Sequence, residues 1–185
     1  MGSHQGVDMV AAAGTPVYAS YAGEVVVAER RGDRGNVVVL RHEWNNQILH
    51  TTYAHLSLIT VRVGAKVEEG EKLGEVGDTG NATAPHLHFQ IETNQDGNHP
   101  FFPRGCQGTI DEIVNEGNCY DQVRNTTLDP ISFLEVATKL GDAITDKPRG
   151  SIYIQGREIQ LSGFMGGFME IERVEQIRFS KEAKS

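Results

Sequence analysis

Two histidines stand one residue apart in the segment TGNATAPHLHFQIE, residues 79–92. Alternate residues of a β-strand project from the same face, so His86 and His88 are expected about 6.5–7 Å apart on one side, with Leu87 and Phe89 on the other. Two imidazoles on one face suit a metal ion and its reacting water, although a pair of structural or exposed histidines fits the same pattern. Other residues must decide between these interpretations.

A second group of metal-binding residue types lies in the segment HQGVDM, where His4 and Asp8 are four residues apart. Imidazole and carboxylate are common zinc ligands, and one histidine of the later pair would complete three protein ligands with a fourth position open for water. That composition is typical of a catalytic zinc site rather than a closed structural one. A histidine so early in the chain can also be incidental, so this ligand set is a hypothesis.

His55 is a third candidate, in the segment TTYAHL. Strand alternation predicts that it shares a face with Tyr53 and Thr51. A single histidine on a half-apolar strand is more often structural than catalytic, so the role of His55 depends on its neighbours in the fold.

The elements that would position these residues are short β-strands. Between Thr15 and Glu92, runs rich in Val, Ile, Thr and Tyr recur about every 8 to 12 residues with glycine-containing turns between them, which predicts an all-β sandwich or barrel. No segment with helical periodicity interrupts these runs. Pro85, directly before the histidine pair, fits the start of a strand, where it removes no interior ladder hydrogen bond.

The second half of the chain has a different pattern. Residues 94–127 are expected to form a long loop that carries both cysteines. The segment LDPISFLEVATKLGD predicts a helix over 129–140, with Asp129 as N-cap and Pro130 at the first helical position. Residues 150–185 alternate again and are expected to form a C-terminal β extension with two further strands.

The composition limits the classes of partner. The 185 residues are 38% hydrophobic, enough for one sizeable core and a small second lobe. The formal net charge of −8 disfavours nucleic acid and anionic membrane surfaces, because both prefer a basic face. No run approaches the roughly 18 apolar residues that cross a bilayer, so no transmembrane segment is expected in this sequence.

Cys106 and Cys119 flank the polar segment CQGTIDEIVNEGNC. Two buried thiols, half of a metal site and a disulfide are all compatible with this spacing, and we favour the disulfide. A bridge across a loop of this size stabilises a fold by roughly 3 kcal/mol in the chain-entropy model. It would indicate an oxidising compartment, because disulfides persist there.

Five segments, in chain order, resemble the peptidoglycan metalloendopeptidases of the lysostaphin and LytM type: HQGVDMVAAAGTPVYASYAGEVV, GNVVVLRH, TTYAHL, VRVGAKVEEGEKLGEVGDTG and PHLHFQIE. The resemblance covers residues 4–92. It implies an antiparallel β-sheet that curves into a groove, related to the barrel-sandwich folds, with zinc at its floor. A zinc metallopeptidase domain is accordingly expected over 4–140, with its core at 4–92, the cysteine loop at 94–127 and the helix at 129–140.

The resemblance also implies roles for five residues. His4, Asp8 and His88 would be the ligands of one zinc ion per chain. His86 would act as general base on the zinc-bound water, and His55 would orient that water or donate a hydrogen bond to the oxyanion. Zinc would bring the pKa of the water toward about 7 and lower the pKa of both neighbouring histidines.

The other histidines receive no catalytic role. His42 falls where the family often has a histidine, and we interpret it as structural, bonding a loop backbone. His50, whose strand parity is opposite to that of His55, and His99 are predicted to face solvent. Asn36 is a weaker candidate for the lining of the groove.

We therefore expect a zinc-dependent endopeptidase that hydrolyses peptide cross-links of bacterial peptidoglycan. A D-alanyl to diaminopimelate bond is favoured over a polyglycine bridge, because the disulfide suits a periplasm. The location expected is the periplasm or the outside of the cell, with the native signal or anchor beyond this sequence. The long cysteine loop delays the helix relative to the family pattern and is expected to border the groove.

Two other classes stay open. A noncatalytic LytM-like domain could bind peptidoglycan or activate an amidase, but such relatives typically lack zinc ligands, and all five expected positions are filled here. A biotinyl or lipoyl carrier is suggested by VRVGAKVEEGEKLGEV. That interpretation lacks the methionine-flanked lysine of such domains and leaves the histidines unexplained. A regulatory protein partner is left open.

Overall fold

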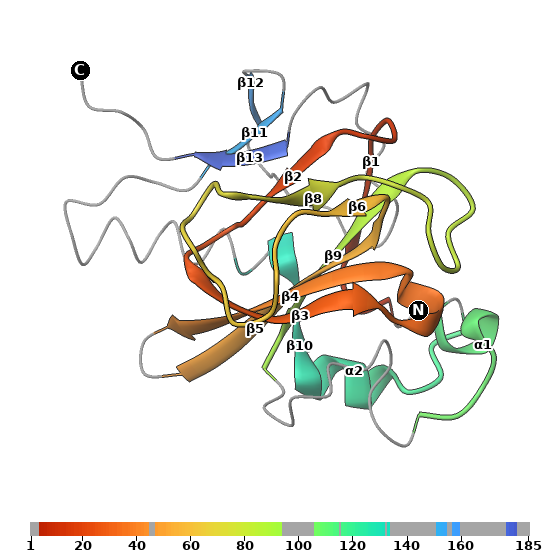
Figure 1. Ribbon diagram of the computed structural model, residues 1–185. Helices are drawn as coiled ribbons and strands as arrows, with labels where there is room; N and C mark the ends of the chain where they lie inside the picture. The colour runs from red at the N-terminus through yellow and green to blue at the C-terminus, as the bar shows by residue number, and fades with distance from the viewer. Residues whose placement is uncertain are drawn as a thin grey trace.

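The structure is a computed structural model that describes residues 4–44, 47–93, 106–114, 116–131 and 133, and three strands at 151–154, 157–159 and 177–180 (Figure 1). Antiparallel β-sheet dominates it and helices are few, which confirms the predicted all-β fold class. Among the described residues no helix has the length and apolar character that a bilayer crossing requires.

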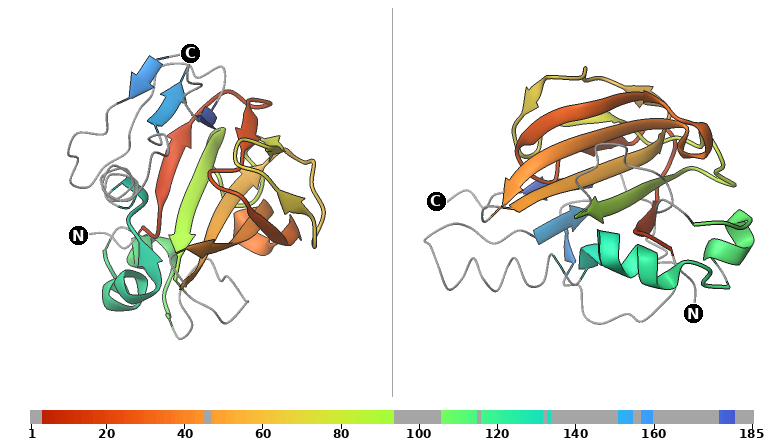
Figure 2. Two further views of the ribbon diagram at one scale, coloured as in Figure 1. Left: turned by 90° about the vertical axis from the view of Figure 1, so that its left-hand side faces the viewer. Right: turned by 90° about the horizontal axis from the view of Figure 1, so that it is seen from below.

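The main sheet has seven strands, and all of its pairings are antiparallel. In spatial order these are β1 (Val7–Val10), β9 (His86–Glu92), β5 (Gln47–Leu56), β4 (Asn36–Trp44), β3 (Gly23–Arg30) and β7 (Lys66–Val67), with β10 (Thr127–Leu128) on the same edge of β9 as β1. The green β9 follows the orange strands β3 to β5 in Figure 2. β9 is therefore paired along both edges, and its side chains are held firmly.

A smaller sheet packs against one face of the main sheet. Its strands are β2 (Pro16–Tyr18), β8 (Lys72–Glu75) and β6 (Leu58–Ile59). Apolar side chains from both sheets form a single buried cluster between them, among them Val17, Leu40, Tyr53, Leu73, Leu87 and Phe89. Leu87 and Phe89 thus point into the core, as strand alternation predicts for the neighbours of the histidine pair.

The cysteine segment contains two short helices, contrary to the expected loop. They are α1 (Ile110–Val114) and α2 (Tyr120–Thr126). The predicted disulfide Cys106–Cys119 is present, with a Cα–Cα distance of 5.6 Å. At the start of α1 the Glu112 carboxylate accepts from the backbone N–H of Thr109 at 2.7 Å, and the Thr109 hydroxyl lies 3.3 Å from the N–H of Glu112. This reciprocal capping box was present in the sequence TIDE and was missed there.

The predicted helix at 129–140 begins as expected. Pro130, Ile131 and Phe133 are helical, and the Asp129 carboxylate accepts from the N–H of Ile131 at 3.1 Å. The rest of this helix lies outside the described residues.

In the predicted C-terminal extension, the structure describes a separate three-stranded antiparallel sheet rather than two strands. Its elements are β11 (Ser151–Ile154), β12 (Arg157–Ile159) and β13 (Ile177–Ser180). The first alternating run of the tail is divided between β11 and β12.

Candidate metal centre

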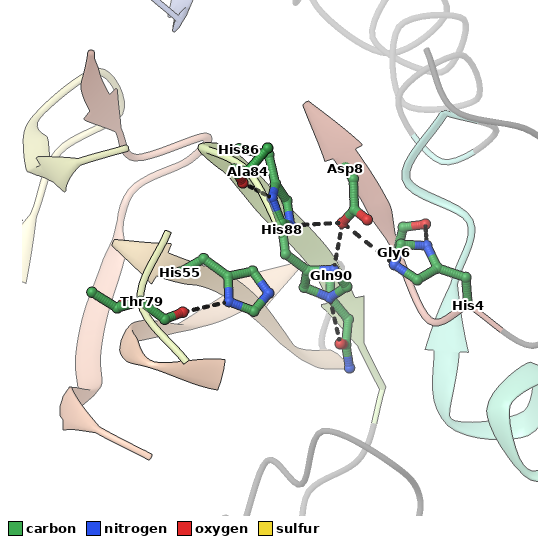
Figure 3. Close-up of polar contacts among 9 residues, drawn as sticks. All are labelled: His4, Gly6, Asp8, His55, Thr79, Ala84, His86, His88 and Gln90. Atoms are coloured by element: carbon green, nitrogen blue, oxygen red, sulfur yellow. Dashed lines mark hydrogen bonds and ion pairs between the residues drawn. The ribbon is translucent and has the colours of Figure 1, made fainter. Parts of the chain in front are cut away.

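The start of the chain and two neighbouring strands bring three potential metal ligands together. Asp8 on β1 and His88 on β9 are directly paired in the ladder, and His4 precedes β1. Asp8 Oδ1 lies 2.9 Å from His88 Nδ1 and 3.4 Å from His4 Nε2 (Figure 3). One ligand atom from each residue lies within 4.8 Å of the other two. These residues, up to 84 positions apart (88 − 4), therefore converge on one point.

Two further imidazoles lie beside the three potential ligands but do not belong to that set. His86 Nε2 lies 3.9 Å from Asp8 Oδ1, on the same face of β9 as His88. The ring of His55 packs 4.7 Å from the ring of His86 and 6.1 Å from that of His88, centroid to centroid. Figure 3 shows His55 and His86 on the side of the cluster away from His4.

The position of His55 depends on a β-bulge, and its predicted face is wrong. Tyr53 pairs with Val38 of β4 and Leu56 with Asn36, so two residues of β5 oppose one of β4. His55 sits in this bulge with a φ of 62°, in the left-handed region that histidine adopts more readily than most residues. Strand alternation would have placed His55 in the core with Tyr53, but the bulge turns it to the metal-site face.

The same error affects His50, which was predicted to face solvent. Its relative exposure is only 5%, and it pairs with Glu92 of β9. Both faces of β5 are covered over most of its length, so parity does not separate a buried side from a solvent side here. His99 lies outside the described residues.

Each of the four clustered histidines directs one ring nitrogen at an oxygen atom. The pairs are His4 Nδ1 with Gly6 O (2.8 Å), His55 Nδ1 with Thr79 O (2.9 Å), His86 Nδ1 with Ala84 O (2.8 Å), and His88 Nε2 with Gln90 Oε1 (3.2 Å). Carbonyl oxygens only accept, so the nitrogen facing them carries the proton. In the neutral ring the other nitrogen is then a lone-pair donor for a metal or an acceptor for a proton.

The charges around Asp8 favour a cation. Burial lowers the pKa of His88 despite the neighbouring carboxylate, so the ring is neutral at pH 7. Burial would raise the pKa of Asp8, but hydrogen bonds and charges from His4 and His88 outweigh it and hold that pKa well below its usual range. Both ring nitrogens of His88 thus face oxygens that accept, Nδ1 the Asp8 carboxylate at 2.9 Å and Nε2 the Gln90 amide oxygen at 3.2 Å, but the neutral ring has only one proton. A divalent cation bound at Nδ1 and Oδ1 would leave that proton to Nε2.

The other two histidines differ in their tendency to take up a proton. Burial, with smaller contributions from the adjacent rings of His86 and His88, lowers the pKa of His55 to about 4. The pKa of His4 is raised, because hydrogen bonding and attraction to Asp8 and a hydrogen bond to Gly6 outweigh the effect of burial. His55 is therefore a neutral imidazole throughout the physiological pH range.

A sequence profile described as Peptidase family M23 matches residues 2–100, more than half of the chain. The chain belongs to peptidase family M23. The predicted relation to lysostaphin-type and LytM-type enzymes is thereby confirmed.

Relatives from two groups of bacteria support the assignment. The chain is 42% identical over 88 residues to the peptidoglycan DD-endopeptidase ShyA of Vibrio cholerae, and the match covers 48% of this chain and 20% of that protein. It is 31% identical over 176 residues to the glycyl-glycine endopeptidase ALE-1 of Staphylococcus capitis, covering 89% of this chain and 48% of that protein. The chain thus spans from about a fifth to about half of these relatives.

Among solved structures, the fold is similar to the catalytic domain of the antimicrobial peptidase lysostaphin from Staphylococcus simulans. The TM-score is 0.52 at 31% sequence identity, and the match covers 71% of this chain and 79% of that domain.

In this M23 peptidase the loop after β8 fixes the orientation of His55. Thr79 accepts from His55 through its carbonyl, and its hydroxyl donates to the carbonyl of Leu56 at 2.8 Å and accepts from the N–H of Asn36 at 2.9 Å. A Cβ at Gly35, whose φ is 63°, would lie 2.3 Å from the Thr79 backbone. Only glycine allows this approach.

Two residues outside the cluster have structural contacts. His42 is buried, donates from Nδ1 to the carbonyl of Ala22 at 2.9 Å, and contacts the Thr51 hydroxyl at 2.7 Å, in agreement with the structural interpretation. Asn36 is half-buried and donates from Nδ2 to the carbonyl of Leu56 at 2.9 Å. Its contribution to the groove stays a prediction.

A second set of polar residues, not recognised in the sequence, lies beside the candidate metal centre. Gln90 and Glu92 continue the alternation of His86 and His88 on β9, so the pattern H-x-H-x-Q-x-E already indicated one polar face. Arg34 joins them from η1 (Gly32–Arg34), and no local signal in the sequence connects it to β9.

Proposed function

We propose that this M23 peptidase is a zinc-dependent endopeptidase that hydrolyses peptide cross-links of bacterial peptidoglycan, in the periplasm or outside the cell. The convergence of His4, Asp8 and His88, flanked by two imidazoles with unprotonated nitrogens, carries the proposal. The disulfide supports an oxidising compartment.

The donor set fits zinc. His4 Nε2, His88 Nδ1 and Asp8 Oδ1 would hold the ion, two nitrogens and one oxygen of the kind that zinc accepts, and three protein ligands leave a fourth position open. Bound zinc would supply Lewis acidity at the scissile carbonyl and lower the pKa of the attacking water.

His86 is suited to the role of general base. Its Nδ1–H donates to the carbonyl of Ala84, so Nε2 carries no proton in the neutral ring and lies on the side of Asp8. Nε2 would take the proton of the attacking water and return it to the leaving amine, while the Ala84 carbonyl stabilises the positive ring in between.

His55 is better suited to accept than to donate a hydrogen bond. Its single ring N–H is engaged by the Thr79 carbonyl, and its pKa of about 4 keeps the ring neutral at pH 7. Of the two roles inferred from the resemblance, orienting the water through an accepting Nε2 fits this state. Donation to the oxyanion would require a second ring proton.

The bond cleaved is inferred from the relatives and the disulfide. We propose a D-alanyl to diaminopimelate cross-link, because the matching region is 42% identical to a peptidoglycan DD-endopeptidase, although a glycyl-glycine endopeptidase matches over more of the chain. Sacculi of defined cross-link type, digested by the zinc-loaded protein, would identify the bond through the masses of the released fragments. His86→Ala protein serves as the control.

The same experiment tests the noncatalytic alternative. Release of cross-link fragments by wild-type but not by His86→Ala protein is expected for an enzyme. Binding to sacculi without any release, by protein that contains stoichiometric zinc, would favour a peptidoglycan-binding or amidase-activating domain.

A further inference from the structure

A row of buried polar side chains continues from His88 along β9. Gln90 and Glu92 follow at alternate positions on the same face, and Figure 3 shows the Gln90 amide on the side of the His88 ring away from Asp8. His88 Nε2 lies 3.2 Å from Gln90 Oε1, and Gln90 Nε2 donates to Glu92 Oε1 at 2.8 Å. As whole residues, His88, Gln90 and Glu92 are 1%, 2% and 2% exposed, so bulk water does not compete for these hydrogen bonds.

The row ends in a buried ion pair. Arg34 Nη2 lies 3.4 Å from Glu92 Oε1, and the Thr52 hydroxyl donates to the same oxygen at 3.3 Å. Both side chains of the ion pair are 3% exposed. Arginine keeps its proton in proteins, so the guanidinium stabilises Glu92 as a carboxylate, which can only accept hydrogen bonds.

The Glu92 carboxylate fixes the direction of the hydrogen bonds along the row. Because Glu92 only accepts, Gln90 must turn its NH₂ group toward it, and the amide oxygen of Gln90 must face His88. That oxygen can only accept from Nε2, so it favours the tautomer of neutral His88 that carries the ring proton on Nε2, the tautomer that metal binding at Nδ1 requires. In that tautomer Nδ1 is unprotonated and directs its lone pair toward the side of Asp8, whose Oδ1 lies 2.9 Å away.

Stability alone does not account for this arrangement. A buried ion pair is often no more stabilising than well-packed apolar residues, because desolvation of the two charges offsets their attraction. Hydrogen bonds to the outer nitrogen of a ligating histidine, in contrast, fix its tautomer and ring orientation. The row therefore has a use at the metal centre that an apolar replacement would not supply.

We propose that Gln90, held in place by Glu92 and Arg34, is a positioning residue that fixes the metal-binding tautomer of His88. The inference rests on the proposed function only in taking His88 Nδ1 as a zinc ligand. Gln90 itself does not touch the substrate or the reacting atoms. Its effect reaches the metal through the orientation and basicity of His88.

The first test is the zinc affinity of Gln90→Leu, measured at neutral pH by competition with a chromophoric chelator. Leucine has a similar volume and cannot accept from Nε2, so affinity is expected to fall by about 10- to 100-fold. Thr51→Val is the matched control. Thr51 is a buried hydrogen-bonded residue of the neighbouring β5, and its hydroxyl contacts His42 on the opposite side of the sheet from His88. Its removal should leave zinc affinity within about twofold of wild type.

A rescue variant separates positioning from general loss of packing. In Gln90→Glu alone, two carboxylates adjoin, and zinc affinity is expected to fall. The double variant Gln90→Glu/Glu92→Gln exchanges the two side chains and restores the order of donors and acceptors. The carboxylate, now at position 90, accepts from His88 and from the amide at position 92, and the oxygen of that amide accepts from Arg34. Zinc affinity should return to within about threefold of wild type, even if the melting temperature does not.

The outcomes distinguish this inference from the proposed function. Wild-type protein that fails to bind zinc contradicts the proposed function itself. Wild-type protein that binds zinc, with Gln90→Leu binding equally well, contradicts the positioning role alone. If Gln90→Leu fails to fold, the soluble double variant decides: recovery of affinity supports the inference, and affinity no better than that of Gln90→Glu overturns it.

Discussion

Asp8 and His88 face each other across the β1–β9 ladder, with the carboxylate oxygen Oδ1 2.9 Å from the ring nitrogen Nδ1. Direct strand pairing makes this contact a property of the backbone register rather than of flexible side chains. A shift of the register by one residue would turn Asp8 to the opposite face of the sheet. The metal centre therefore depends on the same hydrogen bonds that hold the edge of the sheet.

Removal of a ligand and removal of the base should have different effects. Asp8→Ala or His88→Ala is expected to abolish both stoichiometric zinc and activity. His86→Ala should keep most of the zinc but lose about 10²- to 10⁴-fold in kcat, the usual contribution of a general base. Metal analysis and kinetics on the same preparations check this. Full activity in His86→Ala would contradict the assigned role.

His55 should make the stability of the metal-free protein depend on pH. Its pKa falls from 6.5 to about 4 on folding, so the unfolded chain binds more protons between these values. The contribution of His55 to the free energy of unfolding should therefore decrease as the pH falls from about 6.5 to about 4.

Urea denaturation of wild-type and His55→Gln protein in a chelator tests that effect. Glutamine can still donate to the Thr79 carbonyl but does not titrate, so the variant should lose less stability over this pH interval. The lowered pKa of Asp8 adds a separate loss below pH 3.8 that both proteins share. Identical pH profiles from about 6.5 to about 4 would show that His55 is not the cause.

Gly35→Ala should impair catalysis through Thr79. A Cβ there would collide with the Thr79 backbone at 2.3 Å and displace the carbonyl that holds His55. Gly64→Ala is the control, because Gly64 has a comparable φ of 82° but no atom within 4 Å of its added Cβ. The control isolates the strain of a left-handed alanine, about 1–2 kcal/mol.

Kinetics and zinc content of the two glycine variants distinguish the mechanisms. We expect Gly35→Ala to lose kcat beyond the loss in Gly64→Ala while both retain zinc. Equal kcat values in the two variants would show that the close contact between Gly35 and Thr79 does not control the orientation of His55.

The cysteine segment is expected to restrict the peptides that enter the groove. β10 follows this segment and lies on the same edge of β9 as β1, which brings the segment to the side of the sheet that carries Asp8. Deletion of residues 98–123, which removes both cysteines together, should change the relative rates on D-alanyl-diaminopimelate and polyglycine substrates. Unchanged rates and an unchanged substrate preference would show that the cysteine segment does not restrict the peptides that enter the groove.

Local patterns and the family resemblance account for much of the fold and site, but not for irregular geometry. The strands and the start of the helix at Pro130 follow from alternation and capping residues, and the ligand set His4, Asp8 and His88 came from the resemblance. The face of His55 could not be deduced from strand alternation, because a single-residue bulge reverses the alternation and leaves no mark in the sequence.

Long-range contacts could not be predicted from the sequence either. Arg34 and Glu92 are 58 residues apart, and no local signal relates them. Gln90 and Glu92, in contrast, continue the alternation of the histidine pair and could have been recognised as the polar face beneath it. A period-2 pattern of polar residues on a buried strand is therefore as informative as the histidines that begin it.

We propose that one zinc ion binds to His4 Nε2, Asp8 Oδ1 and His88 Nδ1. Anomalous diffraction at the zinc edge from crystals of the zinc-loaded protein tests it most directly. We expect a single peak per chain about 2.0–2.2 Å from each of these three atoms. No peak at this position at neutral pH, or a peak coordinated by other residues, would contradict it.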